Sequence, residues 1–188
     1  EVIHSIFTYD GNPNLLWLST SDGLYIFNKK TGTMRRPKSV ESSKDILEDP
    51  WLYGVYVVNN KNIFFINEQG HFHYDSTTGE VFELTEMNQA LDLDLSFSFM
   101  GQLPNKPNTT LIATSGHLFE FNLETRQLTT IYKVQNYKPQ TFDYIDNWVI
   151  DKFNTLWLSV SGKGLVGLDA ETYEVKYRFN KSSGLTTN

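Results

Sequence analysis

A fourfold internal repeat constrains this chain more than any other feature of its sequence. One turn residue recurs at intervals of 47, 47 and 47 residues, as Asn28, Asp75, Asn122 and Asp169. An apolar anchor keeps steps of 47, 47 and 46 residues, as Trp17, Phe64, Leu111 and Trp157. Four units of 47 residues account for all 188 positions. Such a register indicates one small structural unit used four times.

Each unit contains four short runs of aromatic and β-branched residues separated by polar or glycine-containing turns, the pattern of β-strands. In the last unit these runs are 144–151, 156–160, 164–169 and 174–179. Four-stranded units of about 40 to 50 residues are typical of β-propeller blades. We therefore predict an all-β fold, a β-propeller of four-stranded antiparallel blades in a single domain. The expected blades are approximately 1–40, 41–87, 88–134 and 135–188.

Four blades are the lower limit for a propeller, so we expect this chain to be a segment of a larger one. Aromatic residues make up 14% of the sequence, and we assign most of them to the core between blades. The end blades of a segment would expose apolar faces. We therefore expect the partners to be neighbouring propeller blades or a second copy of the chain in a homo-oligomer.

The connection between the third and fourth strands of each unit has a recognisable turn chemistry. An Asn or Asp at its start can accept the backbone N–H two residues further on. Gly32 and Gly79 then supply a residue with positive φ that closes the hairpin. Units three and four carry Arg126 and Tyr173 at that position. We expect those two turns to close differently.

Charge and composition exclude several classes of protein. Acidic residues outnumber basic ones by 22 to 16, for a formal charge of −6, which argues against nucleic-acid binding. Apolar runs fall far short of the roughly 20 residues that a membrane span needs, so we expect no membrane contact within this chain. The sequence has no cysteine, which excludes disulfides and thiolate chemistry. We expect no cofactor.

A ligand site would lie on the rim where the fourth-to-first and second-to-third connections meet, since strands alternate in direction. The long connections there are 35–50, 85–95 and 133–141. A sugar would require an aromatic ring for stacking and carboxylates or amides for its hydroxyls. The residues that we select as ligand-binding candidates are Trp51, Tyr53, Tyr137 and Asp143.

Two other clusters allow chemistry, each with a simpler structural reading. Asp92 and Asp94, with Glu86, could form a carboxylate pair or a calcium site, or merely a solvated acidic loop. His71 and His73 alternate along a strand and could bind zinc with His117, or simply pack in the fold. We favour the structural reading of both, so we expect no catalytic residue and no metal.

The units resemble the two-component regulator propeller repeat. That repeat reads Asn-x-Leu-Trp-Leu/Ile-Gly-Thr, then Gly-Leu, then Phe-Asp-x-x-Thr-Gly. The first unit matches it with residues 14–20, 23–24 and 27–32, and the last with residues 154–159, 164–165 and 168–169. The two middle units lack the tryptophan.

This resemblance implies a non-catalytic sensor module, an input domain in the periplasm. Proteins of the family are mostly extracytoplasmic regions of hybrid two-component regulators of Bacteroidetes, with the histidine kinase in another part of the receptor. It implies recognition of an oligosaccharide derived from glycan breakdown, or a role in receptor assembly. Two alternatives stay open: a protein–protein interaction scaffold without a small ligand, and a carbohydrate-active enzyme that uses Asp92, Asp94 and Asp143.

Overall fold

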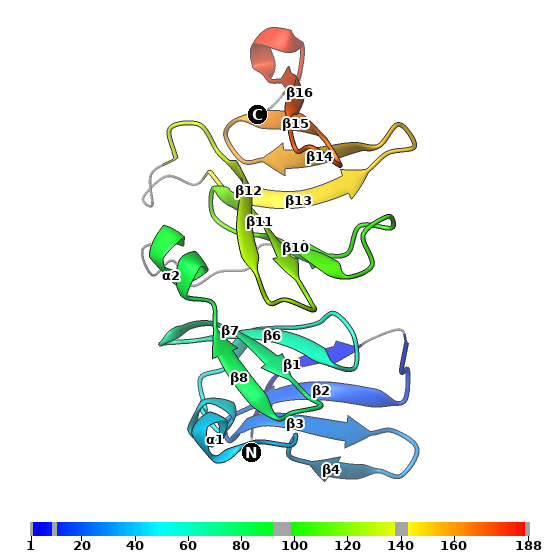
Figure 1. Ribbon diagram of the computed structural model, residues 1–188, viewed down its shortest axis with the longest axis vertical. Helices are drawn as coiled ribbons and strands as arrows, with labels where there is room; N and C mark the ends of the chain where they lie inside the picture. Colours follow the sequence, from blue (N-terminus) through cyan, green and yellow to red (C-terminus); the bar gives the residue numbers. More distant parts are fainter. Residues whose placement is uncertain (1, 9–10, 92–98, 138–142, 187–188) are drawn as a thin grey trace. The chain divides into compact units, whose positions relative to one another are not determined.

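The computed structural model describes residues 2–8, 11–91, 99–137 and 143–186. The chain forms two compact units, Glu1–Leu95 and Ser96–Asn188. Each unit consists of two four-stranded antiparallel sheets (Figure 1). Strands that follow one another in the chain are neighbours in every sheet, so each sheet is a meander. The all-β fold and its four-stranded antiparallel sheets confirm the prediction from the repeat.

The first unit contains two sheets and two short helices. Its first sheet consists of β1 (Ile3–Thr8), β2 (Leu15–Thr20), β3 (Gly23–Asn28) and β4 (Thr33–Arg35), and α1 (Glu41–Leu47) follows. Its second sheet consists of β5 (Tyr53–Val57), β6 (Asn62–Asn67), β7 (Gly70–Asp75) and β8 (Glu80–Glu83), and α2 (Thr85–Leu91) follows. The sheets pack face to face through one apolar core. Within it the rings of Trp17 and Tyr74 meet edge to face, 6.2 Å apart.

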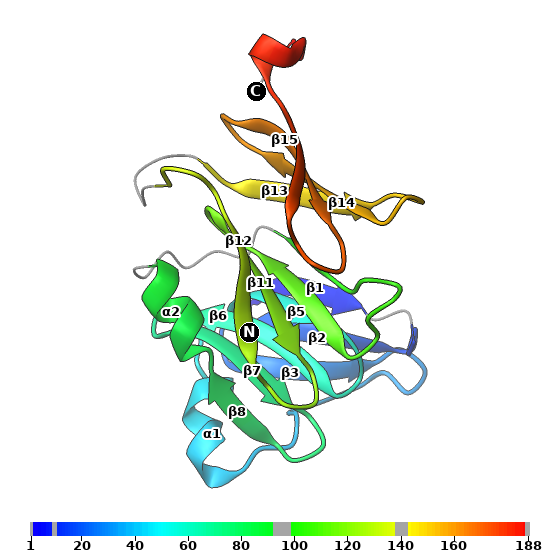
Figure 2. The ribbon, with the colours of Figure 1, turned by 45° about the horizontal axis from the view of Figure 1, so that its top comes forward.

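The second unit repeats this arrangement. Its first sheet consists of β9 (Phe99–Gly101), β10 (Thr109–Ala113), β11 (His117–Asn122) and β12 (Leu128–Lys133). Its second sheet consists of β13 (Ile145–Ile150), β14 (Thr155–Val160), β15 (Gly164–Asp169) and β16 (Val175–Phe179). A 3-10 turn, η1 (Lys181–Ser183), follows β16 (Figure 2). The four strands of this last blade agree with their predicted ranges to within one residue at each end.

All four hairpin turns close in the same way, which corrects the expectation for units three and four. In each turn the side-chain oxygen of the first residue accepts the N–H groups two and three residues further on. Arg126 and Tyr173 adopt φ of 62° and 61°, close to the 67° of Gly32. In all four turns the backbone N–H at this position donates to the carbonyl of the first residue of the turn, whether the residue is glycine, arginine or tyrosine.

The helices α1 and α2 occupy two connections for which the sequence indicated only long loops. Leu47 of α1 is 2% exposed and anchors the helix in the apolar core. The hydroxyl of Ser43 accepts the N–H of Val81 at 2.8 Å, which satisfies a donor of the edge strand β8. No helix in the described parts of the chain has the length and hydrophobicity of a membrane span.

Candidate functional site

A close contact between two connections builds the predicted rim in each blade, through backbone atoms at Gly23 and Gly164 and through a side chain at Gly70 and Gly116. In three blades the third strand begins with a glycine that has positive φ: Gly23, Gly70 and Gly164. In the third blade the equivalent glycine, Gly116, comes one position before the strand. The chain that leaves the fourth strand passes directly over this glycine. A Cβ atom on Gly23 would lie 2.6 Å from Cα of Glu48, and one on Gly70 would overlap the side chain of Asn88. The rim is therefore a packed surface rather than a set of free loops.

The exposed aromatic residues of the first unit lie on this rim. Trp51 is 54% exposed and Tyr53 is 40% exposed, whereas Leu52 between them is completely buried. Because side chains alternate along an extended segment, the buried Leu52 turns both rings outward. Asp49 shapes the segment, since its Oδ1 accepts the N–H of Trp51 at 2.7 Å. The two aromatic candidates thus share one surface.

Polar groups from the neighbouring turn complete this cluster, which we call the Trp51 cluster: Asp49, Trp51, Tyr53, Asn67 and Glu68. Asn67 is fully buried, and its Nδ2 donates to Oδ2 of Asp49 at 3.0 Å. Burial raises the pKa of Tyr53, and the carboxylates of Glu68 and Asp49 raise this pKa further. The phenol therefore stays protonated at neutral pH and can donate a hydrogen bond. Exposed rings beside carboxylates suit a ligand with hydroxyl groups.

Sequence reasoning missed Asn67 and Glu68. Both belong to the turn between β6 and β7, a second-to-third connection of the kind that was expected on this rim. The rule that second-to-third connections lie on this rim could have identified both residues. The prediction rested on the long connections, however, and this turn is short.

The other two candidates, Tyr137 and Asp143, lie in the second unit and have structural contacts. The ring of Tyr137 covers Gly116 and meets the ring of His117 edge to face at 5.2 Å. Asp143 is 8% exposed, and its Oδ2 lies 3.5 Å from Nζ of Lys163. A role in ligand binding stays a prediction for both residues.

The side chains of His71, His73 and His117 are packed in the fold. His73 is buried, with its Nε2 2.7 Å from Oδ1 of Asn62, and Nδ1 of His71 lies 2.8 Å from Oδ1 of Asn88. His117 belongs to the other unit, and burial lowers its pKa. Across the described residues, no three His, Cys, Asp or Glu side chains are grouped so that they could hold a metal ion. Asp92 and Asp94 lie outside the described residues.

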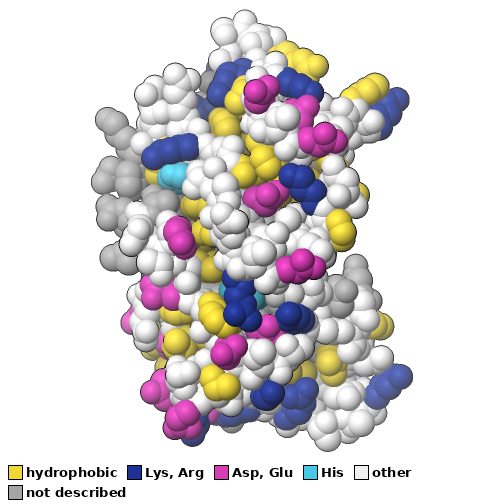
Figure 3. Space-filling model, in the orientation of Figure 1, with side chains coloured by type: hydrophobic (Ala, Val, Ile, Leu, Met, Phe, Trp, Pro, Cys, Tyr) yellow, Lys and Arg dark blue, Asp and Glu magenta, His cyan; other side chains and the backbone are white. Residues whose placement is uncertain are grey.

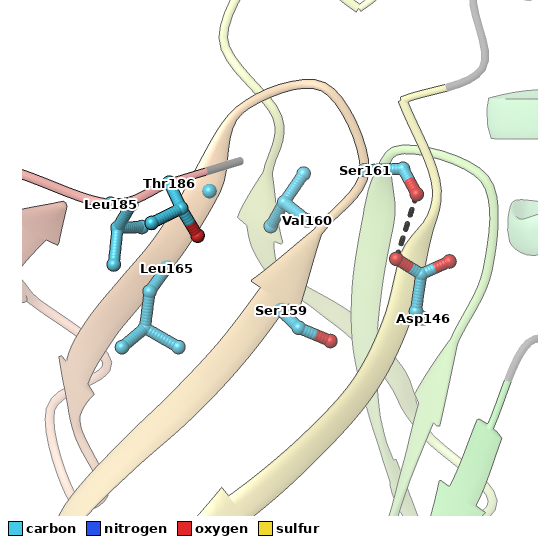
Figure 4. A pocket seen from close by; sticks show the side chains of 8 residues that line it. Asp146, Ser159, Val160, Ser161, Leu165, Leu185 and Thr186 are labelled. Atoms are coloured by element: carbon cyan, nitrogen blue, oxygen red, sulfur yellow. Dashed lines mark hydrogen bonds between the residues drawn. The ribbon is translucent and has the colours of Figure 1, made fainter. Parts of the chain in front are cut away.

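A shallow pocket of about 400 Å³ lies on the rim of the last blade (Figure 4). Ser161 and Asp146 form one side, where the serine Oγ donates to Oδ2 of the aspartate at 2.8 Å. Leu165 and Leu185 line it on the apolar side. No histidine or lysine belongs to its described lining.

Charges are mixed over the surface. On the face drawn in Figure 3, Lys and Arg side chains are interspersed with Asp and Glu. A large surface of one sign is therefore missing from the described residues of this face, whereas a nucleic-acid site uses a continuous basic one.

No protein-family model and no curated protein matches this chain. Solved structures do resemble it. The extracellular domain of BT4673 from B. thetaiotaomicron, described as a one-component system, is 17% identical with a TM-score of 0.60, over 100% of this chain and 24% of that one. The extracellular domain of BT3049 from B. thetaiotaomicron, described as a hybrid two-component system, is 17% identical with a TM-score of 0.62, over 98% and 23%.

These likenesses show the fold, so the four sheets are blades of the β-propeller type. The chain spans about a quarter of the length of the two solved chains. Both come from the kind of regulator that the sequence motifs resemble. The tricorn protease is also similar, at 15% identity and a TM-score of 0.54, over 93% of this chain and 16% of that one. The fold by itself therefore does not separate a sensor from an enzyme.

Proposed function

We propose that this chain is part of the extracytoplasmic, periplasmic input region of a two-component signalling receptor, without catalytic activity. Two independent observations support the proposal. The first and last units match the motifs of the two-component regulator propeller repeat. The fold resembles extracellular domains described as parts of one- and two-component systems.

The Trp51 cluster carries the second part of the proposal, the recognition of a glycan-derived oligosaccharide. Trp51 offers an exposed ring to the apolar face of a sugar. Asp49 and the exposed Glu68 supply acceptors for sugar hydroxyls, and the protonated phenol of Tyr53 supplies a donor. Binding would signal only through a difference in affinity between two arrangements of the receptor.

Titration calorimetry with plant and host oligosaccharides tests this site. We expect saturable binding of one glycan class, weakened about tenfold or more in Trp51→Ala, because an aromatic residue at the centre of a site contributes about 2 kcal/mol or more. Phe153→Ala is the matched control, since Phe153 is 74% exposed in a turn of the other unit. Failure of every glycan to bind a folded sample, or equal binding by Trp51→Ala, would reject the site.

A second candidate function, assembly through blade faces, rests on the last blade. Val149, Trp157, Gly167 and Tyr177 pair across its strands and so lie on one face. Trp157 occupies the repeat position of Trp17, which is 3% exposed because the next blade covers it. On the last blade, by contrast, Val149 is 61% and Tyr177 45% exposed. We propose that a blade of a neighbouring segment or of a second copy covers this face.

A further inference from the structure

A cleft in the second unit combines cationic and amide side chains in its lining. Its volume is about 280 Å³, and it lies between β12, the start of β15 and the end of β16. Its described lining comprises Tyr132, Val134, Gln135, Asn136, Lys163, Leu165, Val166, Arg178 and Asn180. This lining holds two cations and no carboxylate among the described residues, although the whole chain has a formal charge of −6.

The floor of the cleft is apolar and rigid. Val134 and Val166 are each 2% exposed, and Tyr132 is 7% exposed. Val134 and Val166 both belong to the core between the two sheets of this unit. A buried floor lowers the local dielectric, which strengthens the attraction between a cation on the rim and an anion in the cleft.

Arg178 is the principal charge of the cleft. Its Nη1 donates to the hydroxyl of Tyr132 at 3.3 Å, and its guanidinium carbon lies 6.0 Å from the centre of that ring. These contacts orient the guanidinium, and no carboxylate of the described residues forms an ion pair with it. A planar guanidinium held in this way can present two parallel donors to a carboxylate or sulfate.

Lys163 and the amides extend the set of donors. Lys163 reaches the cleft from the turn before β15, where its Nζ lies 3.5 Å from Asp143. Oδ1 of Asn180 accepts from the N–H and the hydroxyl of Ser182, which turns the amide nitrogen away from these groups. Asn136, at φ 59°, follows Gln135 in a turn closed by the hydrogen bond from the N–H of Tyr137 to the carbonyl of Val134. Side-chain amides beside a cation can bond the hydroxyls of a ligand.

We infer that this cleft binds the carboxylate or sulfate group of an acidic saccharide. Arg178 and Lys163 bind the anionic group, and the amides of Gln135, Asn136 and Asn180 bind ring hydroxyls. This site belongs to the second unit and is independent of the Trp51 cluster. The two sites are told apart by their variants, because binding in the cleft is weakened by Arg178→Gln and not by Trp51→Ala, and binding at the Trp51 cluster shows the reverse.

Calorimetry with four named probes tests the inference: digalacturonate, galactose 6-sulfate, neutral galactobiose and inorganic sulfate. We expect at least one acidic sugar to bind and galactobiose not to bind. Arg178→Gln should weaken binding about 10- to 100-fold, because a hydrogen bond between charged groups contributes about 1.5 to 3 kcal/mol. Binding should also weaken as salt rises from about 0.01 M to about 0.5 M. Lys152→Gln, an exposed lysine of the same unit, is the matched control and should bind like the wild type.

A second measurement keeps the test valid if Arg178→Gln fails to fold. In the wild-type protein, the acidic sugar that binds should shift the side-chain amide resonances of Gln135, Asn136 and Asn180. Binding should persist in Trp51→Ala. The inference is overturned if no acidic sugar binds the wild type, if folded Arg178→Gln binds equally well, or if inorganic sulfate binds as tightly as the acidic sugar.

Discussion

Single residues decide how each hairpin of the repeat closes. Arg126 and Tyr173 occupy a left-handed position that glycine fills in the first two units. For Tyr173 a contact explains the choice. Its hydroxyl lies 2.7 Å from Nζ of Lys106 and bonds Glu120, so that the turn of the last blade is linked to the preceding blade of the same unit. Arg126 is exposed at the equivalent position of the third blade.

Asp75 provides a prediction on pH at the residue scale. Burial alone would raise the pKa of its carboxyl, but hydrogen bonds from Thr77 and Thr78 and the charge of Lys61 hold it at about 2. This pKa lies below the unfolded value of 3.8, so the ionised carboxylate stabilises the fold above about pH 4. That stabilisation is lost as the pH falls from about 4 towards 2.

We expect Asp75→Asn to lower the free energy of unfolding at pH 7 by up to about 2 kcal/mol and to have little effect at pH 2. Asparagine preserves the turn, because Asn28 and Asn122 form the same hydrogen bonds at the equivalent positions. Denaturant unfolding at both pH values measures the difference. An equal loss at pH 7 and pH 2 would mean that shape, and not charge, gives Asp75 its effect.

At the scale of elements, the rim depends on helices and loops that dock onto the turns of their own blade. Helix α1 ends directly over Gly23. Arg36 links the turn before this glycine to the residue that follows the helix. One nitrogen of Arg36, Nη2, bonds Oδ2 of Asp22 at 2.7 Å, while its Nε lies 3.8 Å from Oε1 of Glu48. This docking places Asp49 and Trp51, which come immediately after α1. The first candidate site therefore depends on an element that carries none of its residues.

Two glycine substitutions separate backbone strain from docking. Both Gly23 and Gly32 have positive φ, but only Gly23 has backbone atoms of α1 and Glu48 against the position of a Cβ atom. We expect Gly32→Ala to cost about 1 kcal/mol of stability, the price of the left-handed conformation alone. Gly23→Ala should cost about 2 kcal/mol more, because the helix must move away. If both substitutions lowered the free energy of unfolding equally in denaturant experiments, α1 would be shown to move away from Gly23 without a cost in stability.

At the scale of the whole molecule, each unit is a pair of blades with its own core. A blade pair leaves two faces without a partner inside the unit. The last blade has such an uncovered face. On it the rings of Trp157 and Tyr177 stack at 5.4 Å, and Val149 on the same face is exposed. Exposed apolar surface of this kind favours association.

We expect the mass of this chain in light scattering to rise with concentration. The double substitution Val149→Lys and Tyr177→Lys should return it to a monomer, because two charges on the face oppose its burial. Phe153→Lys adds a charge at an exposed turn residue outside this face and serves as the control. A wild-type chain that stays monomeric at high concentration would count against assembly through copies of the chain.

The sequence by itself determined the four-stranded antiparallel blades and the Asn or Asp that opens each hairpin turn. These features depend on local rules, namely strand alternation, turn residues and the spacing of the repeat. It also offered Trp51 and Tyr53 as candidates, because these aromatic residues follow the long connection 35–50 on the expected rim. The turns at Arg126 and Tyr173 were predicted wrongly. The prediction considered only the conformational preference of one residue, whereas the hydrogen bonds of the whole turn are the same in all four blades.

Only the tertiary structure decided which groups surround the candidates. It placed Asn67 against Asp49 and Glu68 near Tyr53, and it gave Tyr137 and Asp143 packing and ion-pair contacts. It also assembled the cleft of Arg178 and Lys163 from strands and turns of two blades. Burial and charge pairing depend on segments that are distant in the chain. A repeat can therefore predict the architecture of every blade without showing which blade carries a site.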